Sequence, residues 1–343
     1  MEPGKRRGTF SALAAVILLA VVFLCRTFTP WADFYSLHIY PVLSGAVSLL
    51  SSWIPFSHAE ILVVAASVYA VFCLIRIRKR WLSLISLILW ITVWFYAGWG
   101  VNYFRSGIFA RAGETPVRYE RKPFLSFLSD YTASLESCLS AGKVPLEDKD
   151  AVEKDLKSFF SSLDKAWGLS TPKKWQHPKK LLFNRLYSAV GVSGFVGPFF
   201  NEIQVNGDVL PLQYAFTYAH ELSHLMGVSS EAEANYWGFV SCAASSLPGV
   251  RLSAYQSLLP YVVSNARRVL PEEDYVQWLR SVPEEALKEM NAQSEYWSGL
   301  YSPFVGSVQD WIYNLYLKGN RISGGTADYS EVIRILMTLG MRD

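Results

Sequence analysis

Three long apolar runs in the first hundred residues dominate the hydrophobic pattern of the chain. They predict transmembrane helices at about 10–27, 59–76 and 81–100, because each is close to the ~20 residues that cross a ~30 Å hydrocarbon layer. Three such runs so close together argue against buried core helices. The first could instead belong to a signal peptide, but no small-residue cleavage site follows it, so we interpret it as an uncleaved anchor.

Positive charges flank these runs unevenly. They cluster before the first run and between the second and third, at Lys5, Arg6, Arg7, Arg76, Arg78, Lys79 and Arg80. Because positively charged loops stay in the cytoplasm, the pattern predicts a multi-pass protein of the cytoplasmic (inner) membrane, with residues 101–343 on the extracytoplasmic side. Residues 31–58 are then an outer loop, with an amphipathic helix at the membrane interface around residues 42–54.

After residue 100 the pattern becomes that of an ordinary globular domain. We interpret residues 101–121 as a juxtamembrane linker and residues 122–343 as one domain. Helical periodicity to residue 167 gives way to short β-favouring stretches between glycines and prolines, and helices return from residue 211. This order predicts an α+β domain with a small mixed sheet plus helices, preceded by an α-helical transmembrane region.

Charge and cysteine content narrow the function only slightly. The net charge of +3 is too small and dispersed for a nucleic-acid surface, so we expect no nucleic-acid partner. Cys138 and Cys242 could form a disulfide in an oxidising compartment. Cys242 also fits a buried free thiol, because it falls on an apolar helix face.

The stretch "YAHELSHLM" places two of the chain's five histidines four positions apart, with a glutamate beside the first. On a helix, His220 and His224 lie on one face and can bind one zinc ion, for which neutral imidazole is a good ligand. Glu221 projects beside the open coordination position, where a general base is needed. The uncharged surroundings favour a buried metal site, although two core histidines on an apolar helix would give the same spacing.

The helix that follows the turn at Gly227 is expected to supply a third ligand. Ser230 with Glu233 matches a capping box, which gives Glu233 a structural role at the helix start. Glu231 is then free to reach the metal, and Asn235 can hydrogen-bond to a ligand imidazole. The alternative for Glu231 is a solvated acid favoured by the helix dipole.

The β-favouring stretch at residues 199–206 precedes this metal-binding helix. An edge strand in that place of a zinc peptidase can hold an extended substrate through backbone hydrogen bonds. Asn201, Glu202 and Gln204 are therefore candidate substrate-binding residues. A plain sheet strand is the alternative.

Several stretches carry a resemblance to known families. "TYAHELSHLM" followed by "EAEAN" resembles the gluzincin superfamily of zinc metallopeptidases. "GVSGFVGPFFNEIQVN" and "YNLYLKGNRISGGTADYSEVIRIL" resemble a bacterial membrane family, domain-of-unknown-function family 3810, as does the chain from about residue 97 onward. The gluzincin resemblance implies a zincin-like α+β fold, with Glu221 as base and one zinc ion bound by His220, His224 and Glu231.

A peptidase also needs a donor that stabilises the oxyanion. Tyr329 lies in a glycine-rich stretch and is our first candidate, ahead of Tyr313 and Arg321. Packing or surface roles are the alternative for all three.

Two functions fit these observations. The first is a membrane-anchored zinc metallopeptidase that contacts the lipid bilayer and hydrolyses a peptide or protein substrate. The alternative is a non-catalytic zinc-binding envelope scaffold or sensor. Glu221 and the absence of an evident fourth ligand favour the enzyme. A small transporter is disfavoured, because the three apolar runs carry no ionisable residue away from their ends.

Overall fold

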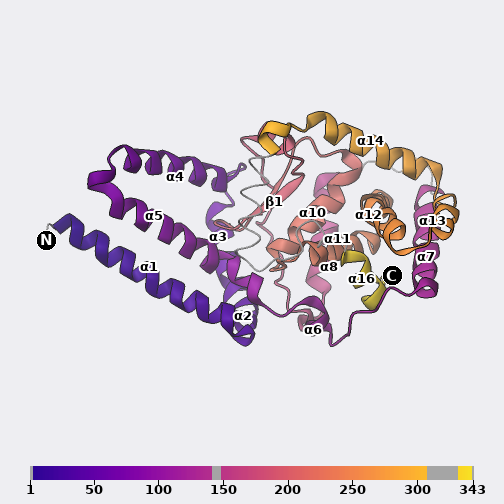
Figure 1. Cartoon of the computed structure of the whole chain (residues 1–343), viewed down its shortest axis with the longest axis horizontal. Helices are drawn as coiled ribbons and strands as arrows, with labels where there is room; N and C mark the ends of the chain where they lie inside the picture. The colour runs from indigo at the N-terminus through magenta and orange to yellow at the C-terminus, as the bar shows by residue number, and fades with distance from the viewer. Residues whose placement is uncertain (1–2, 141–147, 307–330, 342–343) are drawn as a thin grey trace.

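The computed structural model describes residues 3–140, 148–306 and 331–341. A group of long N-terminal helices extends to one side of a mostly helical domain (Figure 1). Within these described ranges, four helical stretches are long and apolar enough to cross a membrane: Thr9–Thr27, Thr29–Ser51, His58–Ile75 and Ile77–Gly98. The chain is therefore a membrane protein.

Three of these helices contain the spans predicted from the sequence. They are α1 (Pro3–Thr27), α4 (His58–Ile75) and α5 (Ile77–Gly98), and α1 and α4 both pack on α5. The fourth stretch runs from α2 (Thr29–Phe34) through a π-helical segment (Tyr35–Ile39) to α3 (Tyr40–Ser51). The sequence predicted an outer loop with one interfacial helix here, and the structure makes most of it helical.

The core of the domain is formed by α10 (Pro211–Leu225), α11 (Glu231–Ala243) and α12 (Pro248–Val269), which pack on one another. Tyr218 of α10 and Trp237 of α11 are completely buried. The remaining helices that the structure describes after α5 surround this core or lead up to it. They are η2 (Gly100–Phe104), α6 (Ile108–Ala112), α7 (Arg121–Ser140), α8 (Lys149–Ser162), η3 (Lys165–Trp167), α9 (Asn184–Ser188), α13 (Glu272–Leu279), α14 (Glu284–Leu300) and α16 (Val332–Leu339).

A two-stranded antiparallel sheet packs on α10. Its strands are β1 (Gly194–Gly197) and β2 (Glu202–Val205), with Gly194 opposite Val205 and Gly197 opposite Glu202. Asn201, in the connection, has a φ of 51°, a left-handed conformation that asparagine tolerates better than most residues. The prediction of a small sheet among helices is confirmed in this coarse form, although the described residues are mostly helical.

Residues 101–121, predicted as a linker, are folded onto the domain. The guanidinium of Arg105 donates to the carbonyls of Gly168 at 2.7 Å and Gly227 at 3.2 Å. That of Arg111, on α6, donates to the Trp167 carbonyl at 3.1 Å. The segment therefore fixes the domain to the end of α5, whereas a linker would leave the two free to move.

Both cysteines that could have paired are free. Cys242 lies on α11 and is completely buried, and this burial raises the pKa of its thiol. The interpretation of Cys242 as a buried free thiol is confirmed.

Candidate metal centre

The HExxH motif lies on the last two turns of α10. Pro211 occupies the first turn of this helix, where its missing N–H is not needed. Tyr218 and Leu222 point into the core and are fully buried. The face that carries His220 and His224 is therefore turned toward the cavity in front of the helix.

A tight turn brings the next helix back to the motif. Gly227 has a φ of +100°, which glycine adopts without steric cost, and its N–H bonds to the His224 carbonyl at 3.0 Å. Ser230 then caps α11 by accepting the Glu233 N–H at 3.3 Å. Glu231, the first residue of α11, is thereby placed beside the histidine pair.

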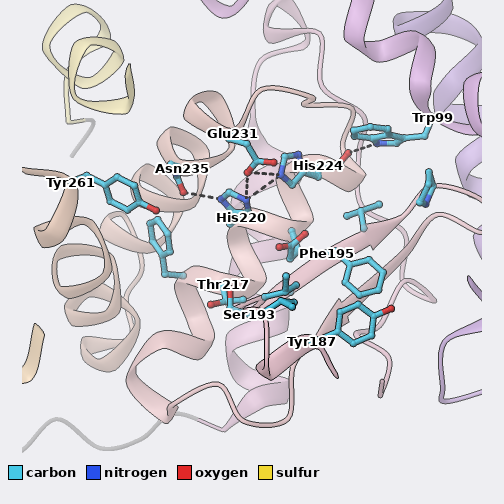
Figure 2. Close-up of a pocket in the computed structure, with 18 of the residues that line it drawn as sticks. Trp99, Tyr187, Ser193, Phe195, Thr217, His220, His224, Glu231, Asn235 and Tyr261 are labelled. Carbon is cyan, nitrogen blue, oxygen red and sulfur yellow. Dashed lines mark hydrogen bonds and ion pairs between the residues drawn. The ribbon is translucent and has the colours of Figure 1, made fainter. Parts of the chain in front are cut away.

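His220, His224 and Glu231 converge as predicted (Figure 2). The Nε2 atoms of the two histidines lie 3.1 Å apart. Oε2 of Glu231 lies 3.2 Å from Nε2 of His220 and 3.6 Å from Nε2 of His224. These three atoms form a compact triangle that one metal ion can face.

Hydrogen bonds on the far side of each ring fix the two imidazoles. Nδ1 of His220 lies 2.9 Å from Oδ1 of Asn235, and Nδ1 of His224 lies 2.8 Å from the carbonyl oxygen of Val228. Because both oxygens accept hydrogen bonds, each Nδ1 carries a proton and donates. In a neutral ring, Nε2 then keeps its lone pair for a metal, and the predicted role of Asn235 agrees with this contact.

Three electron-pair donors this close repel one another unless a cation lies among them. Burial alone lowers the pKa of His224, but the Glu231 carboxylate outweighs it and raises that pKa to about 9. Burial likewise opposes ionisation of Glu231, yet His224 and His220 hold the pKa of this carboxyl well below its usual range. The charge of Glu231 thus favours a positive charge among these three donors.

Glu221 lies on the same helix and is only 4% exposed. Burial raises the pKa of its carboxyl, and its Oε2 has no hydrogen-bond partner within the described part of the chain. β1 approaches closely: a Cβ at Gly194 would lie 2.9 Å from Cγ of Glu221 and 2.9 Å from the Gln204 carbonyl oxygen. Only glycine fits there, and Glu221 keeps a free oxygen beside the candidate metal centre.

A cavity of about 710 Å³ lies in front of the candidate metal centre. β1 forms one wall with Phe195, against which Tyr187 of α9 stacks at 4.9 Å. Trp99, directly after α5, forms another wall, and its indole Nε1 donates to the His224 carbonyl at 3.0 Å. Tyr261 of α12 closes the opposite side (Figure 2).

Comparison with known proteins places this site in a family. The family model described as "Protein of unknown function (DUF3810)" matches residues 35–337. The chain belongs to this family. No curated protein and no solved structure matches the chain. The matched region contains α3, α4, α5 and all three converging residues, so these three helices and the site fall within the same family match, whereas α1 precedes it.

The structure does not bring the three candidate substrate-binding residues to the cavity. Glu202 is 3% exposed and faces Lys179, with 2.8 Å between its Oε1 and the lysine Nζ. Gln204 and Asn201 are equally buried, and Gln204 donates to the Ser57 hydroxyl at 3.1 Å. β2 therefore faces the membrane helices, and β1 is the strand that borders the cavity. This corrects our placement of the substrate-binding strand.

The oxyanion candidates Tyr313, Arg321 and Tyr329 lie outside the described residues. The structure places another candidate for this role, Tyr261, in the cavity wall, and sequence analysis did not identify it. Its hydroxyl points toward Asn235 and His220 (Figure 2), and burial raises its pKa. No local pattern marks Tyr261, because it comes from a helix that packs on the motif only in the folded chain.

Glu233 departs from its predicted role. Ser230 caps the helix as expected, but the Glu233 carboxylate does not return to the helix start. It forms an ion pair with Arg111 of α6 and accepts the indole N–H of Trp237 at 3.1 Å. Side-chain exposure is 9% for Arg111 and 5% for Glu233. This buried pair anchors the helix turn that carries Glu231.

Proposed function

We propose that the chain is a membrane-anchored zinc metallopeptidase of gluzincin type with a zincin-like domain. His220, His224 and Glu231 hold one zinc ion, and Glu221 is the general base. The observation that carries this proposal is the convergence of three electron-pair donors beside a buried carboxylate with a free oxygen. An ordinary structural helix needs neither feature.

The spacing of the three donor atoms suits zinc. Ligand atoms ~2.0–2.1 Å from a tetrahedral ion are about 3.4 Å apart. The observed separations of 3.1, 3.2 and 3.6 Å bracket that value. Two imidazoles and one carboxylate also form a donor set typical of catalytic zinc, in which a water or substrate would take the fourth position.

Zinc, when bound, supplies a Lewis acid that polarises a carbonyl and acidifies a water molecule. Glu221 accepts the proton of the attacking water through its free Oε2 and passes it to the leaving amine. Its raised pKa suits both steps, because a proton held too weakly could not be stored between them. β1, with Phe195 exposed to the cavity, is the strand along which an extended peptide can bind.

The test of this function is a metal and activity measurement on the purified full-length protein. The wild type should contain about one zinc per chain and cleave members of a fluorogenic peptide library. Glu231→Ala should lower zinc affinity more than about 100-fold, since loss of an outer partner alone costs 10–100-fold. Glu233→Gln should retain the zinc. A zinc-loaded wild type that cleaves nothing would favour the scaffold or sensor function.

Tyr261 is the donor that we propose for the oxyanion. Tyr261→Phe should lower turnover about 10²-fold or more and leave the zinc content unchanged, because the hydroxyl is no metal ligand. Tyr275→Phe, on α13, serves as a control and should match the wild type. Unchanged turnover of Tyr261→Phe would remove Tyr261 from the mechanism.

The positive-charge pattern supports a catalytic domain outside the cytoplasm, reached by three crossings. A reporter enzyme that is active only outside the cytoplasm should work when fused to the C-terminus. The same reporter fused after Arg78 should be inactive, because Arg78 lies in the predicted cytoplasmic loop. The opposite pair of results would invert the orientation.

A further inference from the structure

The polar face of α3 is buried and its apolar face is exposed. Ser44, Ser48 and Ser51 are at most 4% exposed, whereas Leu50 is 75% and Trp53, just beyond the helix, 78% exposed. The Ser48 hydroxyl accepts from Gln176 Nε2 at 3.0 Å and from Trp175 Nε1 at 3.2 Å. The polar face therefore packs on the domain, and the apolar face points outward, as expected for a helix at the membrane interface.

The chain after Lys179 is fixed at the start of α4. The Ser57 N–H donates to the Lys180 carbonyl at 3.1 Å, and the Lys180 N–H donates to the Pro55 carbonyl at 3.1 Å. The Glu60 carboxylate, in the first turn of α4, accepts the N–H groups of Leu182 at 2.7 Å and Phe183 at 3.0 Å. Because α4 is apolar enough to cross a membrane, these residues lie at the level where the bilayer ends.

Residues 182–186 expose an apolar surface at this level. Leu182, Phe183 and Leu186 are 50%, 44% and 55% exposed, and we name these three residues the α9 patch. Lys180 and Arg185 beside them are exposed cations. Apolar side chains flanked by positive charge are suited to the interface of a bilayer with anionic lipids.

The cavity is bordered by the same elements. Tyr187 follows the α9 patch by one residue and lines the cavity together with Phe195. On the α5 side, Trp99 lines the cavity immediately after the candidate span ends at Gly98. Trp94, within that span, donates from its indole to the Phe199 carbonyl at 2.9 Å, just beyond β1. Two cavity walls are thus attached to the membrane boundary.

We propose that the α9 patch lies in the bilayer interface and that the cavity receives a membrane-anchored polypeptide, which is cut close to the lipid surface. This substrate class rests on the proposed peptidase function. The bilayer contact rests only on the placement of α3, α9 and the start of α4. The two parts are therefore measured separately.

The bilayer contact is measured by lipid quenching. Leu186→Cys, in a Cys138→Ser background, is labelled with an environment-sensitive dye in the full-length protein, reconstituted into phosphatidylethanolamine–phosphatidylglycerol vesicles. Lys288→Cys on α14, 73% exposed, is the matched control. The parent without an added cysteine gives the background. Nitroxide-labelled lipids should quench the dye at position 186 at least about threefold more than at position 288. Equal quenching would overturn the bilayer contact.

The substrate class is measured with palmitoylated fluorogenic peptides in the same vesicles. In each peptide a spacer separates the palmitoyl chain from the cleavable sequence taken from the library. The short spacer has about four residues and reaches at most ~14 Å, and the long spacer has about twenty residues and reaches at most ~70 Å. The short-spacer peptides should be cleaved at least as fast as the long-spacer peptides. Cleavage confined to the long spacer or to free peptides would overturn the membrane-anchored substrate class. Cleavage of no peptide at all would overturn the peptidase function and this substrate class together, and quenching alone would then decide the bilayer contact.

Discussion

Replacing Glu221 by glutamine is expected to lower peptide cleavage about 10²–10⁴-fold and to leave the bound zinc unchanged. Glutamine has the shape of glutamate, so it fits the same narrow space beside Gly194. The space is narrow because a Cβ built on Gly194 would lie 2.9 Å from Cγ of Glu221. Its amide cannot accept and return a proton as the carboxylate does. The triangle of His220, His224 and Glu231 does not include Glu221, so coordination should survive.

Metal analysis and turnover must be measured on the same preparation of this variant. Glu285→Gln on α14, an exposed carboxylate far along the chain, removes the same charge and should match the wild type in both readouts. Full zinc with unchanged turnover would remove Glu221 from the mechanism. Loss of zinc would show instead that its carboxylate supports the metal.

The parts of this fold that follow from short-range patterns were predictable. Apolar runs of about twenty residues marked α1, α4 and α5, since length and hydropathy alone decide whether a helix suits a bilayer. The four-residue spacing put His220 and His224 on one face of α10, and Gly227 marked the turn that returns Glu231 to them. Each of these features depends on residues within about twenty positions of one another.

Features set by distant residues were not predictable. β2, which contains Gln204, was expected at the cavity. Instead, Oε1 of Glu202 on the same strand lies 2.7 Å from Nδ1 of His58, a residue 144 positions away in the chain. Strand alternation alone cannot say which face meets the membrane helices and which meets the site. For the same reason, only the structure places Trp99 against His224.

The pair between Arg111 and Glu233 shows how such a contact changes an interpretation. Ser230 and Glu233 match a capping box, and half of that box forms. The other half is replaced because a buried guanidinium, 122 positions earlier in the chain, needs a carboxylate. A segment that looked like a linker therefore supplies a structural partner to the helix that carries Glu231.

Replacing Glu233 by alanine is consequently expected to destabilise the protein by about 3–5 kcal/mol, more than the loss of a helix cap at ~1 kcal/mol. The change leaves the guanidinium of Arg111 buried without its partner and removes the acceptor of the Trp237 indole N–H. For a domain of this size, the midpoint of thermal unfolding should fall by roughly 10 °C, measured on the metal-free protein to exclude any contribution from zinc.

Two comparisons separate this buried pair from ordinary surface charge. Glu284→Ala breaks the exposed pair with Lys288, in which the carboxylate is 81% exposed, and should change stability by less than about 1 kcal/mol. Arg111→Met combined with Glu233→Leu removes both buried charges and should recover part of the stability lost by Glu233→Ala, since no unpaired charge remains. If Glu233→Ala instead emptied the zinc site at unchanged stability, Glu233 would be the third ligand, and Glu231 would have the structural role.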